Sequence, residues 1–219
     1  MAVITISRQY GSGGKEIARN ICDILGYSYF DKSLMVEVAS EVGGLDADHV
    51  VDFSEDTYKM HSFLEKLFGR RRVKVETWKE DHSGERSLQI QSLDEEAGVG
   101  LVRDTIHAAY ERGNVVIVGR GGQAILREQP GVLHVRIIAP LGARALRLKE
   151  RDKITMIEST NLATRKDQVA EAYLDKFFGI DWDDPLLYHL LINTGKCDLD
   201  TAARIIVDTL PQLRTIPGA

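Results

Sequence analysis

Short runs of apolar residues alternate along the chain with longer segments in which apolar positions recur at helical spacing. The short runs are rich in β-branched or aromatic residues, which is typical of buried parallel strands. They lie at residues 2–6, 27–30, 115–118, 133–139 and 190–193. The longer segments predict helices at residues 15–25, 33–42, 58–68, 91–112, 122–126, 140–152, 161–178 and 200–210.

Strands that alternate with helices predict one α/β domain over residues 1–219. Its sheet should be parallel and five-stranded, with helices on both faces. Ligands of such folds bind beyond the carboxyl ends of the strands. The loops that follow the five strands are therefore the first places to search for a site.

The composition is that of a globular protein with an acidic balance. The chain has 219 residues, of which 43% are hydrophobic and 28% charged, enough for one sizeable core. The net charge of −5 argues against DNA or RNA as the main partner, because phosphate backbones are bound by basic faces. An anionic ligand must instead be held by a local basic pocket.

Neither a membrane span nor a secretory segment is expected. No apolar run is long enough to span a membrane, and the first one is a strand ending at Ser7, not a signal peptide. Cys22 and Cys197 fit reduced core thiols, and the six histidines show no zinc-binding spacing. These features predict a cytoplasmic protein.

A glycine-rich loop follows the first strand and opens directly onto a helix. Glycines let successive backbone N–H groups converge on a phosphate, and the helix N-terminus adds partial positive charge. A neighbouring lysine can bridge the terminal phosphates of a nucleotide. The loop therefore predicts an ATP site, although a plain strand-to-helix turn is the alternative. The predicted contacts are Gly11, Ser12, Gly13, Gly14, Lys15 and Glu16.

The loop departs from the P-loop pattern G-x-x-x-x-G-K-[ST]. If Gly14 and Lys15 are the G-K pair, Gln9 stands at the first glycine and Glu16 at the hydroxyl residue. If the pattern slides by one residue, Arg8 stands at the first glycine and Gly14 at the lysine. Glu16 could contact Mg²⁺, but an acidic residue in the first turn of a helix is the simpler interpretation. We assign no protein ligand to a metal.

Several segments together carry a family resemblance. They are residues 4–14, 25–32, 116–121, 178–185 and 191–194. In these segments the sequence resembles the cytidylate kinase-like family, P-loop relatives within the nucleoside monophosphate kinases, and the resemblance runs through nearly the whole chain. It implies a three-layer P-loop kinase fold with a helical acceptor-binding insertion at 52–92 and an arginine-rich lid at 147–178.

The resemblance also implies residues that bind the acceptor. Asp31 stands at the end of the second strand, where relatives place an aspartate beside the acceptor, and Lys32 replaces the hydroxyl residue that follows it. Arg120 matches an arginine that would bind the acceptor phosphate, while the next residue, an aspartate in the family, is Gly121 here. Lys32 and Gly121 leave open an acceptor other than CMP.

Arginines are expected to close over the transferred phosphoryl group. Arg144, Arg147 and Arg151 share one helix face by their spacing, and a solvated face is the alternative. Arg151 and Arg165 are the first candidates for a catalytic role. After the last strand, Asn193 and Thr194 stand where relatives contact adenine, which is also compatible with a simple turn.

These features together predict an ATP- and Mg²⁺-dependent phosphotransferase acting on a nucleoside monophosphate, with CMP or dCMP first. Two alternatives stay open: another small metabolite as acceptor, or a regulatory nucleotide-binding protein with weak turnover. The predicted partner is a small molecule, with no nucleic acid and no membrane. A homo-oligomer is left open, because Trp78, Phe63 and Phe68 suit a subunit contact.

Overall fold

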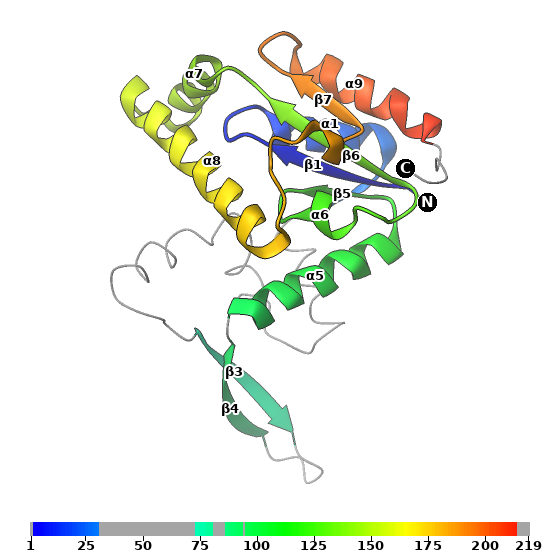
Figure 1. Cartoon of the computed structure of the whole chain (residues 1–219), viewed down its shortest axis with the longest axis vertical. Helices are drawn as coiled ribbons and strands as arrows, with labels where there is room; N and C mark the ends of the chain where they lie inside the picture. The colour runs from blue at the N-terminus through cyan, green and yellow to red at the C-terminus, as the bar shows by residue number, and fades with distance from the viewer. Residues whose placement is uncertain (1, 31–72, 81–85, 94, 214–219) are drawn as a thin grey trace.

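A five-stranded parallel sheet forms the centre of the computed structural model, which describes residues 2–30, 73–80, 86–93 and 95–213 (Figure 1). The strand order is β2-β5-β1-β6-β7, and every pairing is parallel. The strands are β1 Val3–Arg8, β2 Ser28–Phe30, β5 Val115–Val118, β6 Val132–Ile138 and β7 Leu190–Asn193. The five predicted strands are confirmed.

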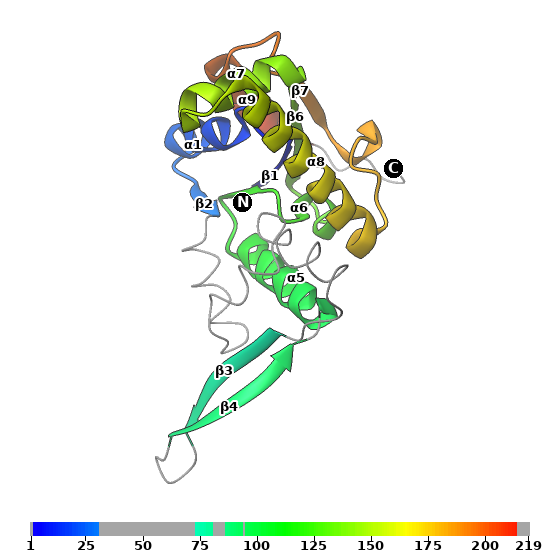
Figure 2. The same cartoon turned by 90° about the vertical axis from the view of Figure 1, so that its left-hand side faces the viewer.

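Helices cover both faces of this sheet, as Figures 1 and 2 show. One face packs against α1 Gly14–Leu25 and α9 Leu199–Thr209 through a cluster that includes Ile4, Ile21 and Ile206. The other face packs against α5 Glu95–Arg112 through a cluster that includes Val115 and Ile106. Alternate residues of each strand face opposite layers, so both faces must be apolar, which is why the strands are nearly continuous hydrophobic runs.

Two further helices follow the carboxyl ends of strands: α6 Gly122–Ile125 after β5 and α7 Leu141–Asp152 after β6. α8 Met156–Phe178 packs on α7, the 3₁₀ turn Pro185–Leu187 precedes β7, and the 3₁₀ turn Leu210–Gln212 follows α9. The predicted start of α8, at residue 161, was wrong. A capping box of Thr155 and Glu158 starts the helix earlier, with the Thr155 side chain accepting the Glu158 N–H and the Glu158 side chain accepting the Thr155 N–H.

The predicted helix over 91–112 is also corrected. Residues 91–93 belong to β4 Arg86–Leu93, which pairs antiparallel with β3 Val73–Glu80, and α5 begins only at Glu95. Apolar and polar residues alternate from Leu88 to Gln91, a period of two that favours a strand. Within the predicted helical insertion, the described residues therefore form a hairpin. The helices predicted at 33–42 and 58–68 lie outside the described residues.

A buried arginine interrupts the apolar pattern of β6. Arg136 is 1% exposed; it donates to Ser7 Oγ at 3.0 Å and to the Asp183 carboxylate at 2.6 Å. Its guanidinium carbon lies 3.8 Å from the centre of the Trp182 ring, whose Nε1 also donates to Ser7 Oγ, at 2.7 Å. The Tyr188 hydroxyl lies 3.3 Å from the same oxygen. Ser7 is thus the shared acceptor of a buried polar network beside the end of β1.

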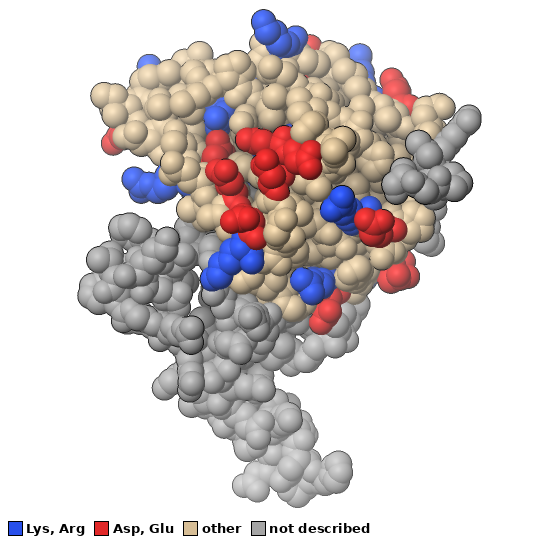
Figure 3. Space-filling model, in the orientation of Figure 1, with Lys and Arg blue, Asp and Glu red and all other residues tan. Residues whose placement is uncertain are grey.

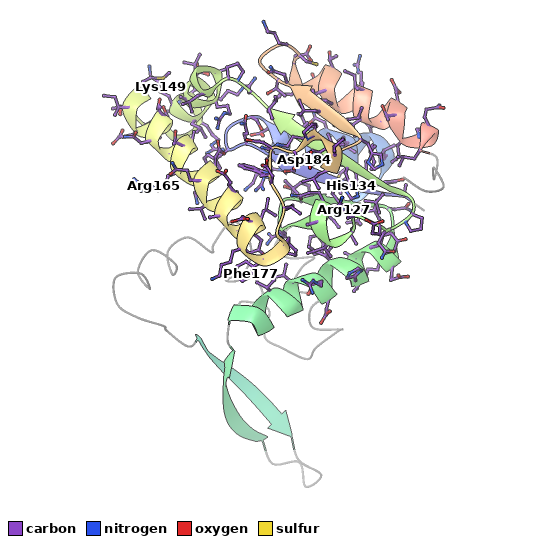
Figure 4. The ribbon with its side chains drawn as sticks, in the orientation of Figure 1. Arg127, His134, Lys149, Arg165, Phe177 and Asp184 are labelled. Atoms are coloured by element: carbon purple, nitrogen blue, oxygen red, sulfur yellow. The ribbon has the colours of Figure 1, made fainter. Side chains whose placement is uncertain are left out.

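A buried histidine on the same strand makes folding sensitive to acid. The Nδ1 atom of His134 is hydrogen-bonded to the Thr5 hydroxyl at 2.6 Å, and the ring is also hydrogen-bonded to the backbone of Leu126. Burial and the neighbouring His189, whose ring stacks at 5.4 Å, lower the pKa of His134 from 6.5 to about 4. His134 is 4% exposed, and Figure 4 labels its position.

His134 should therefore destabilise the fold as the pH falls. Its pKa is lower in the folded than in the unfolded state, so its contribution is complete above pH 6.5 and is lost as the pH falls from 6.5 toward 4. The expected loss is roughly 3 kcal/mol. Urea unfolding across this range should show a smaller pH dependence in His134→Gln than in the wild type. Equal slopes for the two proteins would contradict the assignment.

Among the residues that the structure describes, no helix is both long enough and apolar enough to cross a membrane.

Cys22 and Cys197 are free thiols packed at the edge of the core between the sheet, α1 and α9. Burial, together with the charge of Asp23, raises the pKa of Cys22 to about 11, so this thiol is unreactive at neutral pH.

Candidate functional site

A cavity of about 320 Å³ lies at the carboxyl end of β1, between the glycine-rich loop, α7 and the start of α9. We call residues 9–14 the glycine loop. The loop and the first turn of α1 form one wall, and Arg147, Leu148, Arg151 and Leu199 form the other. Of the predicted site residues, the cavity brings together Gly11, Gly13, Gly14, Lys15, Glu16 and Arg151.

The glycine loop ends in an uncapped helix N-terminus. Gly13 is the N-cap, in a left-handed conformation (φ 89°), and no side chain caps the helix that begins at Gly14. The first N–H groups of a helix have no partner within it and can bind an anion. A Cβ at position 13 would come within 2.5 Å of Leu199 Cδ2, the end of a flexible side chain, so the backbone angle is the main reason for glycine there.

Gln9 holds the loop against the neighbouring strand. Its N–H donates to the Ile137 carbonyl and its side-chain Oε1 accepts the Ala139 N–H, both at 3.0 Å. The side chain thereby continues the pairing of β1 and β6 beyond the last backbone bond. This gives a structural reason for a glutamine where one alignment of the P-loop pattern expects glycine.

Tyr10 is clamped by a buried ion pair. Asp167 of α8 accepts the Tyr10 N–H at 2.8 Å and pairs with Arg144 of α7 at 2.6 Å. Arg144 also donates to the Tyr10 carbonyl at 3.0 Å and to the Ala139 carbonyl at 2.9 Å. The side chains of Arg144 and Asp167 are 7% and 17% exposed. Both peptide groups of Tyr10 are therefore fixed from α7 and α8.

A second set of hydrogen bonds joins the glycine loop to the end of β7. Thr194, 4% exposed, donates to the Ser12 carbonyl at 2.6 Å. Arg147 donates to the Thr194 carbonyl at 2.6 Å and to the Gly11 carbonyl at 3.4 Å. Asn193 closes a turn by accepting the Gly195 N–H. Ser12, Asn193 and Thr194 thus lie behind the cavity, and a contact of the last two with adenine stays a prediction.

The four candidate arginines have different surroundings. Arg144, Arg147 and Arg151 share one face of α7, as their spacing predicted, and the structure turns this face toward the glycine loop. Arg151 lines the cavity, donates to the Tyr10 hydroxyl at 3.2 Å and pairs with Asp152, whose hydrogen bond raises the pKa of the guanidinium. Arg165 is exposed, is not among the described residues that line the cavity, and in Figure 4 lies on the side of α8 that faces away from β1.

Arg120 lies at the carboxyl end of β5, as predicted, and is 7% exposed. It stands in a left-handed conformation between two left-handed glycines. A Cβ at Gly121 would lie 2.7 Å from the Phe178 ring, so packing at the end of α8 explains why an acidic side chain is missing there. The remaining acceptor candidates, Asp31 and Lys32, lie outside the described residues.

The cavity is basic, whereas one outer face is acidic. Figure 3 shows carboxylates gathered near the middle of that face, where Figure 4 labels Asp184. Asp184 accepts the Leu186 N–H, and Asp183 pairs with Arg136, so both have structural roles. Within the described part of the chain, no group of three or more His, Cys, Asp or Glu side chains is placed to hold a metal ion.

The cavity carries four cationic side chains. They are Arg8, Lys15, Arg147 and Arg151, and among the described residues that line the cavity Glu16 is the one carboxylate. The cavity thus has the local basic character that an anionic ligand of this acidic chain would need. Arg8 had no predicted role, although a basic residue directly before the loop was a visible signal in the sequence. Nothing near Asp167 in sequence pointed to its contact with Tyr10.

A parallel sheet with helices on both faces and a glycine loop joining β1 to α1 define the three-layer α/β class of P-loop proteins. The chain belongs to the cytidylate kinase-like family, whose model matches residues 3–196. The family and the fold together support a nucleotide kinase.

Two curated relatives and one solved structure are similar over nearly the whole chain. A "Cytidylate kinase" of Thermococcus sibiricus is 26% identical over 96% of this chain and 89% of the relative. A second "Cytidylate kinase", from Saccharolobus islandicus, is 27% identical over 98% of this chain and 94% of the relative. An uncharacterized protein from Eubacterium ventriosum aligns with a TM-score of 0.64 and 20% identity over 97% of this chain and 100% of that one, which shows a shared fold.

Proposed function

We propose that this protein transfers the terminal phosphoryl group of ATP to a nucleoside monophosphate, with CMP or dCMP as the first candidates. The observation that carries the proposal is the basic cavity on the uncapped N-terminus of α1. Relatives named cytidylate kinase support the choice of acceptor. The proposed place of action is the cytoplasm.

The chain's own residues suit a polyphosphate. The backbone N–H groups at the start of α1 and the cations of the cavity provide donors and positive charge on one side of a shaped pocket. Phosphoryl transfer depends mainly on positioning and on neutralising charge. The two sets of hydrogen bonds that fix the backbone of Tyr10, Gly11 and Ser12 would position the loop against the phosphates.

Mg²⁺, which the family implies, would neutralise part of the charge of the phosphates. Glu16 is the cavity residue whose oxygen atoms suit this ion, since position 16 offers no hydroxyl group. Phosphate oxygens and water would supply the other ligands. The position of Glu16 in the first turn of α1 equally suits a purely structural role, in which its negative charge interacts favourably with the helix N-terminus.

We assign Lys15 and Arg151 to the transferring phosphates and Arg165 to a lid that spans residues 147–178. Within that lid, Ala170, Tyr173 and Leu174 are buried in a cluster with Val99 and Trp182. Movement that keeps this cluster intact must therefore leave residues 170–174 in place.

The acceptor would lie beside Arg120, Asp31 and Lys32, covered by an insertion at residues 52–92. For the adenine, Asn193 and Thr194 remain the proposed contacts, because they end β7 beside the glycine loop. The assay below tests the acceptor directly.

ADP release with Mg·ATP and each of CMP, dCMP, UMP, AMP and GMP tests the proposal. We expect release that depends on CMP or dCMP. Lys15→Ala should lower kcat/KM for ATP by about 10- to 100-fold, because a hydrogen bond from a charged group contributes about 1.5–3 kcal/mol. Unchanged kinetics in Lys15→Ala would remove this lysine from the site.

A kinase for another small metabolite is the second candidate. It is favoured by the contact between Gly121 and the Phe178 ring, over which Arg103 lies at 5.8 Å. That packing leaves no room at position 121 for an acidic side chain that could contact a base. Binding of ATP without ADP release for any of the five nucleotides would support this candidate or a regulatory role, and would contradict the monophosphate kinase.

A further inference from the structure

The structure decides how the glycine loop aligns with the P-loop pattern. In G-x-x-x-x-G-K the lysine directly follows the last glycine of the loop and begins the helix. Here the left-handed N-cap is Gly13, and the first helical residue is Gly14. The position of the lysine is therefore occupied by Gly14, and the same spacing puts Arg8 at the first glycine.

These two departures from the pattern are in contact with each other. A Cβ built on Gly14 would lie 2.7 Å from the Cβ and 3.0 Å from the Cγ of Arg8. The stem of Arg8 therefore occupies the space into which a side chain at position 14 would extend. Arg8 is the last residue of β1, is 9% exposed and lines the cavity.

Lys15 does not fill that space. It is the next residue of α1, and successive residues of a helix point about 100° apart around the axis. Lys15 is exposed and reaches the cavity from the surface, whereas Arg8 reaches it from a buried strand. The two cations therefore approach a ligand of the loop from different sides.

We propose that Arg8 is the principal phosphate-binding cation of the glycine loop. It would have the role that the lysine of the P-loop pattern has in other P-loops, whereas Gly14 stands at that lysine position here. This inference rests on the proposed nucleotide site. It adds to that site a residue that does not stand at the lysine position of the P-loop pattern. A guanidinium is always charged and can bind two phosphate oxygens at once, so it suits a fixed position on a strand. Lys15 then adds a second, more mobile charge.

Calorimetric titration of the whole protein with ATP and with inorganic tripolyphosphate tests the role of Arg8. Arg8→Met keeps the stem that packs on Gly14 and removes the charge. We expect it to weaken the binding of both ligands by about tenfold or more. Arg204→Met makes the same change on the exposed surface of α9, away from the cavity, and should bind both ligands as the wild type does.

Titration with both ligands distinguishes a failure of this inference from a failure of the proposed function. Tripolyphosphate binding that is lost in Arg8→Met supports the role of Arg8 even if ATP is not bound, and the absence of ATP binding would then contradict the nucleotide kinase. Wild-type affinity for tripolyphosphate in Arg8→Met overturns the inference. A wild type that binds neither ligand overturns both.

An exchange of the two residues tests whether their positions are equivalent. Arg8→Gly combined with Gly14→Lys restores the spacing G-x-x-x-x-G-K in this chain. The double variant should bind tripolyphosphate at least about tenfold more tightly than Arg8→Gly alone. Equal affinities would overturn the equivalence. If melting curves show that Arg8→Met or the double variant does not fold, Arg8→Lys, which keeps a stem and the charge, should retain more affinity than Arg8→Gly.

Discussion

Asp167→Ala is expected to lower the free energy of unfolding by about 3–5 kcal/mol, because it leaves the buried Arg144 without its counter-charge. The side chain of Arg144 is 7% exposed, and its carboxylate partner lies 2.6 Å away. The same substitution removes the acceptor of the Tyr10 N–H in the glycine loop. For a chain of this length the melting temperature should fall by roughly 6–20 °C.

The effect of Asp167→Ala should extend to ATP. Since Asp167 holds Tyr10 in place, a looser loop should raise KM for ATP more than it lowers kcat for the molecules that remain folded. Asp167→Asn is the matched control, because an amide oxygen can still accept the Tyr10 N–H while the charge is lost. It should retain the KM of the wild type more closely than Asp167→Ala does. A KM that is equal in all three proteins would show that the clamp stabilises the fold without positioning the loop.

Ser7→Ala should have the second-largest effect, a loss of about 2–4 kcal/mol in the free energy of unfolding. The hydroxyl is the shared acceptor of Arg136 and the Trp182 indole, at 3.0 and 2.7 Å. Alanine leaves both buried donors without this acceptor, and each unsatisfied donor costs about 1–3 kcal/mol. Urea unfolding, monitored by circular dichroism, measures the loss.

Asp183→Asn is the control for Ser7→Ala. Asp183 also pairs with Arg136, but its side chain is 73% exposed, so solvent screens the interaction. We expect a change within about 1 kcal/mol. Equal losses in Ser7→Ala and Asp183→Asn would mean that the ion pair, and not the hydroxyl, supports the network.

Much of the fold could be predicted from the sequence because its signals are local. Each central strand is a short apolar run, and both faces of a parallel sheet must be apolar, so the runs identify the strands directly. The hairpin of β3 and β4 was missed because the helical period was extended back from α5 into the alternating residues before it. The start of α8 was missed because the capping residues Thr155 and Glu158 stand outside its apolar pattern.

The candidate site was predictable only in part. The glycine loop and Lys15 follow a strand and open a helix, which is a local arrangement, and Arg151 follows from its spacing on α7. The clamp on Tyr10 joins residues 157 positions apart in the chain, and no local pattern encodes such a contact. Arg8 could be seen in the sequence, but its relation to Gly14 depends on how the loop turns back across the end of β1.

The sequence by itself determined the five strands, the α/β class and the glycine-rich loop between the first strand and the first helix, since each depends on backbone preferences and burial patterns within a few neighbouring residues. Only the tertiary structure decided which polar side chains serve the site and which serve the fold. Arg136 and Arg144 are buried and hold the framework, whereas Arg8 and Arg151 line the cavity. The physical reason is that an arginine's role depends on its surroundings: whether its charge meets a carboxylate, an aromatic ring or a cavity is set by packing between segments remote in sequence.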